Sequence, residues 1–244
     1  PKALSILAEL ENDLHLYPDG NGTKLKEEIA NHEGVLFDNI IIGNGSNEIL
    51  ELAARAFLNP NTSSVASKHA FAVYKIVTQS AGASLIEVPT CNWAHDLKSF
   101  EDYLDSNTRV IFIANPNNPT GTYNSHEEVH SLLKKVPSSV LVVLDCAYFE
   151  YVTKEDYVKP LDLLNEFDNL LITKTFSKIH GLASIRVGYG IANSSLIEVL
   201  NRIRQPFNVN SIAQAMACVA INDHAHIKQS IELNSQQYEF VFDK

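Results

Sequence analysis

Short runs of apolar residues alternate along the chain with longer stretches in which apolar residues recur every three or four positions. The runs Val110–Ile113 (VIFI) and Leu141–Leu144 (LVVL) are apolar at every position, which is typical of strands covered on both faces. The periodic stretches between such runs predict amphipathic helices. This alternation predicts an α/β fold built on a mostly parallel, doubly wound sheet.

The pattern gives approximate bounds for these elements. The predicted strands are Asn39–Ile42, Ser64–Ala66, Ser84–Val88, Arg109–Ile113, Val140–Leu144, Leu170–Thr173 and Val187–Ile191. The predicted helices include Thr23–Asn31, Asn47–Leu58, Phe71–Gln79, His126–Val136 and Leu196–Ile203. Arg202–Asn210 interrupts the pattern with a proline, and everything after it is predicted to be helical. We therefore predict a domain boundary near Gln205, with residues 1–205 forming a large domain and residues 206–244 beginning a small α+β C-terminal domain.

Composition and charge narrow the class of protein. The 244 residues include 19 Lys+Arg and 29 Asp+Glu, a net charge of −10, and 45% are hydrophobic, as in a globular protein. The negative charge argues against a general nucleic-acid or anionic-membrane surface. No apolar run approaches the roughly 18 residues of a membrane span, and no signal peptide opens the chain. Three widely spaced cysteines indicate a reducing compartment, so we expect a cytoplasmic protein.

The two ends of the sequence suggest a longer polypeptide. The chain starts at Pro1 without an initiator methionine, and it stops at Lys244 inside a stretch that is predicted to be helical. We therefore expect that an N-terminal segment and part of the active site lie outside it.

Two loops that follow predicted strands carry candidate binding chemistry, because parallel strands bring such loops to one edge of a sheet. Gly43–Glu48 (GNGSNE) combines two glycines with a helix start and could cradle a phosphate, although an ordinary capped turn fits it equally well. It departs from the dinucleotide fingerprint because Glu48 stands where the third glycine belongs. Asn115–Gly121 (NPNNPTG) is stiffened by two prolines, and its amides favour ligand binding over a structural turn.

Asp145 directly follows a third predicted strand, and Tyr148 lies three residues further on. A carboxylate at the end of a buried strand is costly unless a cation or a hydrogen bond meets it. A ligand contact, a helix cap and a structural ion pair are all consistent with this position.

A fourth loop, Thr173–Arg186 (TKTFSKIHGLASIR), offers hydroxyls, an amine and a guanidinium. The hydroxyls of Thr175 and Ser177 together with Arg186 suit a phosphate. A lysine held at the end of a strand can lose its proton and act as a nucleophile. Considered alone, however, Lys178 is also consistent with an ordinary solvated lysine.

The segment His126–His130 (HEEVH) matches a zinc-protease motif. Ser125 is predicted to cap the helix, which places His126 in its first turn, and no third ligand follows. The segment continues as SLLKKV, an amphipathic pattern. We interpret it as a surface helix and predict no metal site.

Taken together and in order, these loops resemble the fold-type I, class II family of pyridoxal-phosphate-dependent aminotransferases. The motifs GNGSNE, HAFAVY, NPNNPTG, LDCAY and TFSKIHGLASIRVGYG extend over nearly the whole chain. The details FIANPNNPTGTY and RQPFNVNS are similar to the histidinol-phosphate branch of that family. Relative to the family, the chain lacks an N-terminal segment and most of the C-terminal small domain, which carry residues that recognise the substrate.

The resemblance implies pyridoxal 5′-phosphate as cofactor, with Lys178, Asp145 and Tyr148 as catalytic residues. Lys178 would bind the cofactor covalently and carry the proton shift, and Asp145 would pair with its pyridine nitrogen. Asn118 and Tyr148 would hydrogen-bond to the phenolic oxygen. Phe71 would stack on the ring. The burial of Asp145 would then be offset by the ring cation.

The remaining positions of the family motif concern the cofactor phosphate and the oligomer. The phosphate would lie among Ser46, Asn47, Thr175, Ser177 and Arg186. Tyr17, in LYPDG, resembles the tyrosine that reaches the phosphate of a neighbouring subunit, which implies a homodimer. Lys68, His69 and Ala70 precede Phe71 where many relatives have Pro-Thr or Pro-Ser, so the stacking contact and the substrate preference stay open.

The function implied by the resemblance is exchange of an amino group between L-histidinol phosphate and 2-oxoglutarate, by a ping-pong mechanism. An aromatic amino-acid aminotransferase and a threonine-phosphate decarboxylase of the same fold are alternatives, because substrate choice depends partly on residues outside the chain. A regulator that senses the cofactor would need a basic DNA-binding segment before Pro1. An inactive scaffold would require the loss of a key residue, and all of them are present: Asn118, Asp145, Tyr148, Lys178 and Arg186.

Overall fold

A seven-stranded sheet forms the centre of the computed structural model, which describes residues 1–10 and 13–242. Its strand order is β1-β9-β8-β7-β6-β2-β3; β9 pairs with β1 and β8 in antiparallel fashion, and the remaining described pairs are parallel. The predicted mostly parallel α/β sheet is therefore confirmed. The strands are β1 (Ile40–Gly43), β2 (Ser63–Ser67), β3 (Ser84–Val88), β6 (Thr108–Ala114), β7 (Leu141–Asp145), β8 (Leu170–Thr175) and β9 (Gly188–Ala192).

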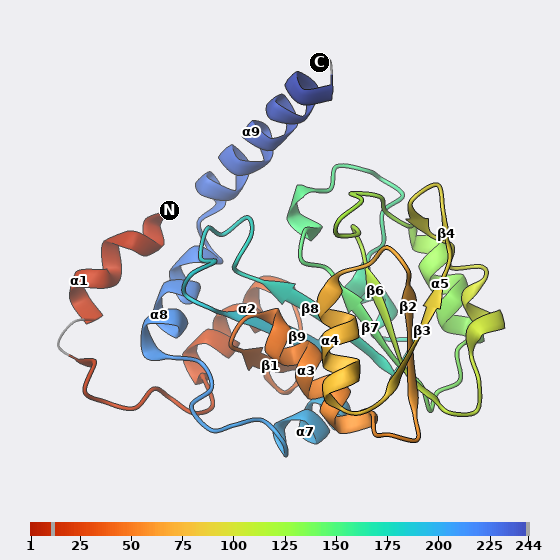
Figure 1. The fold of residues 1–244 in the computed structure, drawn as a ribbon. Helices are drawn as coiled ribbons and strands as arrows, with labels where there is room; N and C mark the ends of the chain where they lie inside the picture. Colours follow the sequence, from red (N-terminus) through yellow and green to blue (C-terminus); the bar gives the residue numbers. More distant parts are fainter. Residues whose placement is uncertain (11–12, 243–244) are drawn as a thin grey trace.

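Helices cover both faces of this sheet (Figure 1). One face packs against α3 (Ser46–Phe57), α4 (Ala72–Ser80) and α7 (Ser194–Asn201). The other packs against α2 (Thr23–Glu33), α5 (His126–Lys135), α6 (Pro160–Leu163) and α8 (Ser211–Ala220). The other helical elements within the described residues are η1 (Lys2–Ile6), α1 (Leu7–Leu10), η3 (Phe37–Asn39), η4 (Phe100–Tyr103), η5 (Phe149–Tyr151) and α9 (His224–Phe242).

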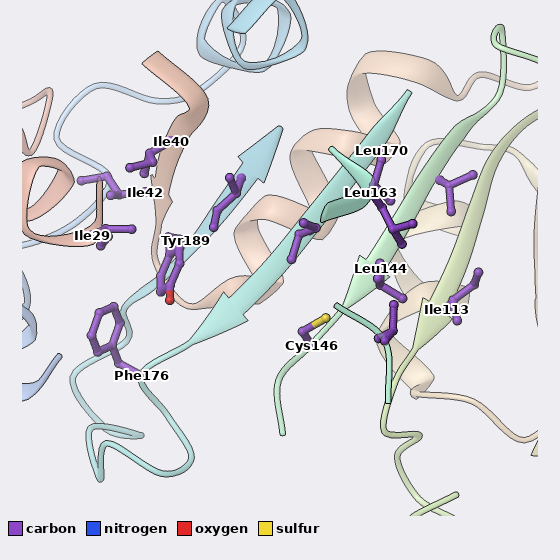
Figure 2. Packing of buried hydrophobic residues seen from close by; sticks show 14 of the residues in the cluster. Ile29, Ile40, Ile42, Ile113, Leu144, Cys146, Leu163, Leu170, Phe176 and Tyr189 are labelled. Atoms are coloured by element: carbon purple, nitrogen blue, oxygen red, sulfur yellow. The ribbon is translucent and has the colours of Figure 1, made fainter. Parts of the chain in front are cut away.

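Side chains alternate between the two faces along each central strand, which explains why these strands are apolar throughout. On β7, Val142 and Leu144 belong to one buried cluster, whereas Leu141 and Val143 belong to the other. Figure 2 shows the first of these clusters, in which Leu144 lies among apolar side chains of neighbouring strands. Because both faces are buried, side chains of the sheet can reach a ligand at the strand ends.

Two features differ from the sequence prediction. The hairpin of β4 (Thr90–Cys91) and β5 (Ala94–His95) was not predicted, because its strands have two residues each and show no readable periodicity. Asn92 and Trp93 form its turn with φ of 49° and 66°.

After Asn210 the described chain is helical as predicted, except for a break at residues 221–223 that the pattern did not indicate. α8 ends at Ala220, and Asp223 then accepts a hydrogen bond from the backbone N–H of His226 (3.4 Å) at the start of α9. α9 buries none of its described residues and projects from the body of the molecule (Figure 1). None of the helices that the structure describes is both long enough and apolar enough to span a membrane. The domain boundary near Gln205 stays a prediction.

Candidate functional site

A cavity of about 220 Å³ opens where β6, β7 and β8 end. The loops predicted to converge at this edge do so, as expected for the carboxyl ends of parallel strands. All the predicted site residues except Tyr17 line the cavity. The full lining is Ser46, Asn47, Phe71, Ala114, Pro116, Asn118, Asp145, Ala147, Tyr148, Thr175, Ser177, Lys178 and Arg186.

The N-terminus of α3 forms one side of the cavity. Its N-cap residue, Gly45, has no side chain to occupy the backbone N–H groups of the first turn, where Ser46 and Asn47 lie. Gly45 has a φ of 75°, and a Cβ at this position would lie 2.3 Å from Nη2 of Arg186. A Cβ on Gly188 would lie 2.4 Å from the backbone nitrogen of Ser46. The two glycines therefore let β9 and the guanidinium approach the start of this helix closely.

Arg186 and two hydroxyls complete this side of the cavity. Nη1 of Arg186 donates to Oγ of Ser177 (3.2 Å) and to the carbonyl oxygen of Ala183 (2.7 Å). The backbone N–H of Ser177 donates to Oγ1 of Thr175 (3.1 Å). Within the described residues, no carboxylate pairs with Arg186. A helix N-terminus, two hydroxyls and a guanidinium whose charge no described carboxylate neutralises form a binding site for an anion such as phosphate.

Asp145 supplies the negative charge of the cavity. It is the last residue of β7, not the residue after the strand as predicted, and it is 4% exposed. Its Oδ2 accepts a hydrogen bond from the hydroxyl of Tyr74, and its Oδ1 accepts one from Oγ1 of Thr173, both at 2.9 Å. Burial raises the pKa of Asp145, while these two hydroxyls and the charge of Lys178 work in the opposite direction.

Tyr74 and Thr173 were not predicted as site residues. The burial of Asp145 was expected to be offset by a ligand cation, whereas two hydroxyls of the protein already contact this carboxylate. The signal for Tyr74 was its position three residues after Phe71 at the start of a helix, which places both on one side. The signal for Thr173 was its strand alternation with Thr175, which places both hydroxyls on one face of β8.

The amide-rich loop between β6 and α5 directs one asparagine into the cavity. Asn115 and Asn117 are buried, and their Nδ2 groups donate to the carbonyl oxygens of Asn124 (2.9 Å) and His69 (2.7 Å). Asn118, by contrast, lines the cavity. The predicted rigid loop therefore uses two amides to hold its own shape and presents the third.

Lys178 and two aromatic residues lie at the open side of the cavity. The Nζ atom of Lys178 is 5.1 Å from the centroid of the Tyr148 ring, and its side chain is exposed. Phe71 is half-buried at the N-terminus of α4. An accessible amine therefore shares one cavity with a buried carboxylate and an anion site.

Tyr17 lies outside the cavity. Its side chain is 83% exposed, and its ring centroid is 4.9 Å from that of Phe207. Because the role expected of Tyr17 involves a second chain, that role stays a prediction.

The HEEVH segment forms the first turns of α5. Ser125 and Glu128 form a capping box there, as the predicted cap required. Nε2 of His130 lies 3.0 Å from Oε2 of Glu166. In the part of the chain that the structure describes, no three His, Cys, Asp or Glu side chains gather in a way that could hold a metal ion.

Comparisons with known proteins find similarity along nearly the whole chain. Residues 2–243 match the family described as aminotransferase class I and II. The chain is 51% identical over 245 residues to histidinol-phosphate aminotransferase 2 of Pseudomonas fluorescens, which covers 99% of this chain and 66% of that protein. It is 46% identical over 236 residues to the histidinol-phosphate aminotransferase of Caldicellulosiruptor saccharolyticus, with coverage of 97% and 66%.

Solved structures show the same similarity in fold. The crystal structure of histidinol-phosphate aminotransferase from Sinorhizobium meliloti in complex with pyridoxal-5′-phosphate matches with a TM-score of 0.92. The two sequences are 28% identical, and the match covers 97% of this chain and 65% of that one. The chain thus spans about two thirds of the length of the proteins that it matches, 66% in the sequence comparisons and 65% here.

Proposed function

The chain belongs to the aminotransferase class I and II family, and from that premise we propose that it is part of a pyridoxal-phosphate-dependent aminotransferase. The proposed reaction exchanges an amino group between L-histidinol phosphate and 2-oxoglutarate in histidine biosynthesis, by a ping-pong mechanism. The names of the similar proteins support this choice of substrate. The observation that carries the proposal is the single cavity shared by a buried carboxylate, an accessible lysine and an anion site.

The donors around the cavity fit pyridoxal 5′-phosphate. A protonated pyridine nitrogen needs a buried anion, and Asp145 is a buried carboxyl group with hydrogen-bond donors on both oxygens. A phosphate needs donors and positive charge, which the N-terminus of α3 and Arg186 offer together with the hydroxyls of Thr175 and Ser177. When bound, this cofactor supplies an electron-withdrawing ring that stabilises negative charge on the substrate carbon that loses its proton.

The residues of the chain then have distinct tasks. Asp145 would keep the ring nitrogen protonated. Lys178 would hold the cofactor covalently, and its Nζ atom would carry a proton to and from the substrate carbon. Phe71 would limit movement of the ring through its aromatic face. Asn118 and Tyr148 would hydrogen-bond to the phenolic oxygen. The phosphate would be held by Ser46, Asn47, Thr175, Ser177 and Arg186.

We further propose a homodimer in the cytoplasm, in which Tyr17 reaches the phosphate site of the partner subunit. The exposure of Tyr17 supports this role, because an 83% exposed tyrosine packed against Phe207 offers contact area to a second chain. The proposed division into a large domain, residues 1–205, and the beginning of a small domain, residues 206–244, assigns part of the substrate recognition to residues beyond this chain.

Absorbance spectroscopy of the full-length protein tests the function. The protein is loaded with pyridoxal phosphate, and the visible band of the lysine-bound cofactor is followed as an amino donor is added without a keto-acid acceptor. We expect rapid loss of the band with L-histidinol phosphate and slow loss with phenylalanine. Lys178→Ala should show neither the band nor transamination. Lys154→Ala, which removes an exposed lysine outside the catalytic cavity, should behave as wild type.

The other outcomes separate the competing functions. Equal loss of the band with phenylalanine would indicate a broad aromatic aminotransferase. Release of carbon dioxide from threonine phosphate would indicate a decarboxylase. If the wild-type protein forms no band at all, or if Lys178→Ala transaminates normally, the assignment of the cofactor and of its lysine is wrong.

A further inference from the structure

The carboxylate of Asp145 is held by two hydroxyls from different elements. We propose that Tyr74, on α4, and Thr173, on β8, are positioning residues that keep Asp145 ionised and aimed at the cofactor ring nitrogen, a role that rests on the proposed function. Each hydroxyl donates to a different carboxylate oxygen at 2.9 Å. Donors on both oxygens restrict rotation of the carboxylate and favour its ionised form.

The packing of Tyr74 fixes the direction from which its hydroxyl acts. The side chain is 1% exposed, and its ring stacks on that of Phe112 with a centroid distance of 4.9 Å and an interplanar angle of 5°. Oγ1 of Thr78 donates to the carbonyl oxygen of Tyr74 (2.7 Å) and also lies 2.7 Å from the hydroxyl of Ser64 on β2. The tyrosine is therefore tied to the sheet through its ring and its backbone, and this packing holds its hydroxyl at Asp145.

Thr173 acts from the neighbouring strand. β7 and β8 are parallel, and Asp145 is the direct register partner of Thr173. Thr173 is completely buried, so its hydroxyl cannot exchange Asp145 for water. Thr173 therefore places one donor beside the carboxylate from the neighbouring strand, while Tyr74 places the other from the covering helix.

Few titratable groups face Asp145. They are Tyr74 from α4, Cys146 from the same strand end, Tyr157 from the segment after η5, and Lys178 from the loop after β8. Burial raises the pKa of Tyr74, Cys146 and Tyr157, so these three groups stay neutral where a carboxyl group titrates. The state of Asp145 is therefore governed by its burial, by the two hydroxyls, by the charge of Lys178 and by a hydrogen bond from the backbone of Ala147.

Tyr74 also has a packing role that an experiment must separate from its hydrogen bond. Its ring meets that of Phe71 edge to face, with a centroid distance of 5.8 Å and an angle of 89°. Loss of the ring would disturb the aromatic residue at the cavity as well as the carboxylate. The substitution Tyr74→Phe keeps the ring and removes only the oxygen.

The test measures the dissociation constant of pyridoxal phosphate for the cofactor-free full-length protein between about pH 5 and 8, where a perturbed carboxyl group can titrate. Removing a donor to an ionised group raises the pKa of that group, so Tyr74→Phe should bind about tenfold more weakly at the acid end. The pH at which affinity falls should move upward by about one unit. Tyr123→Phe is the matched control, because Tyr123 also donates to a carboxylate oxygen at 2.9 Å, that of Asp156, but at an exposed site.

A cofactor analogue with carbon in place of the ring nitrogen distinguishes positioning from packing. For this analogue, Tyr74→Phe and wild type should have equal dissociation constants, because the analogue makes no charged contact with Asp145. Equal weakening of both ligands would show a merely structural role and overturn the inference. An unchanged affinity and pH profile for pyridoxal phosphate would overturn it too.

Thr173→Val provides a second, nearly isosteric variant, and it should shift the profile in the same direction as Tyr74→Phe. If both variants fold and neither shifts the profile, the inference is wrong while the proposed function stands. If the wild-type protein does not bind pyridoxal phosphate, the proposed function itself fails, and the inference fails with it.

Discussion

Replacing Lys174 by methionine should destabilise the protein far more than removing a surface lysine that makes an equally short ion pair. Nζ of Lys174 lies 2.8 Å from Oε1 of Glu33 and 3.6 Å from Oε1 of Glu150, and the side chains of Lys174 and Glu33 are 6% and 5% exposed. Glu33 also accepts a hydrogen bond from the hydroxyl of Tyr189 at 2.5 Å. Methionine would fill much of the space of the lysine but leave two buried carboxylates without their cation.

The burial of the pair sets the expected magnitude. Removing one partner of a buried ion pair costs about 3–5 kcal/mol, because the other charge stays desolvated. Lys135→Met is the matched control, since Nζ of Lys135 also lies 2.8 Å from a carboxylate oxygen, that of Glu101, but the two side chains are 51% and 53% exposed. An exposed pair of this kind contributes about 0–1 kcal/mol. With the shortest N–O distance held equal, the difference comes from burial and from the second carboxylate, Glu150, that Lys174 serves.

The pH dependence of the effect follows from the two pKa shifts. Burial disfavours the charge on Glu33, but Lys174 outweighs it, so the pKa of Glu33 lies below its ordinary 4.5. Its stabilisation is thus complete above the unfolded value and is lost as the pH falls through the lower folded value. Burial likewise disfavours the Lys174 cation, yet the two carboxylates raise the pKa of Lys174 above 10.5, so its stabilisation disappears only as the pH rises through that higher value.

Urea unfolding of the cofactor-free full-length protein, followed by circular dichroism, measures this effect. The deficit of Lys174→Met should be largest between about pH 5 and 10 and should shrink in acid, where protonated carboxyl groups no longer need a cation. Equal free energies of unfolding for Lys174→Met and Lys135→Met at neutral pH would contradict this prediction.

Two further predictions concern the phosphate side of the cavity and a buried histidine. Gly45→Ala should weaken binding of pyridoxal phosphate in a titration by about tenfold or more, because the new Cβ would lie 2.3 Å from Nη2 of Arg186. Gly34→Ala is the control: Gly34 also has a positive φ, 71°, but no atom lies within 4 Å of the new Cβ, so the affinity should be unchanged. Burial lowers the pKa of His180 from 6.5 to about 4. As the pH falls, this histidine is therefore protonated in the unfolded chain before it is protonated in the folded protein, and the free energy of unfolding decreases between pH 6.5 and 4. This loss should amount to about 3 kcal/mol in urea unfolding at the two pH values, and His180→Gln should abolish most of it.

The central sheet was predictable because the sequences of its central strands show a recognisable pattern. Val110–Ile113 and Leu141–Leu144 are apolar at every position, and that pattern requires two covered faces, which in turn requires helices between parallel strands. The hairpin around Trp93 has strands of two residues, too short for any period. The break between α8 and α9 depends on Asp223, whose side chain accepts from the backbone N–H groups of Lys2 (2.8 Å) and His226 (3.4 Å). A contact with Lys2, more than 200 positions away, has no local signature.

The convergence of the candidate site was predictable for the same reason as the sheet. Loops after parallel strands meet at one edge, so Asn118, Asp145 and Lys178 had to approach one another once the strand order was given. The contacts of these site residues with side chains from other elements were not predictable in the same way. Tyr74 reaches Asp145 from a helix on the covering layer, and only the packing of α4 on the sheet determines which strand end that hydroxyl meets.

The alternation of side chains along β8 explains why the charge of Asp145 stays available to a ligand. Thr173 and Thr175 face the cavity side, whereas Lys174, between them, faces the opposite side, where Glu33 and Glu150 hold it. Asp145 is in register with Thr173, so a shift of one residue would place the Lys174 cation beside this carboxylate. A permanent ion pair would then neutralise Asp145 and leave no charge for a ring nitrogen. Because hydroxyls contact Asp145 instead, its charge is stabilised without being cancelled, and the sheet itself keeps the competing cation on its other face.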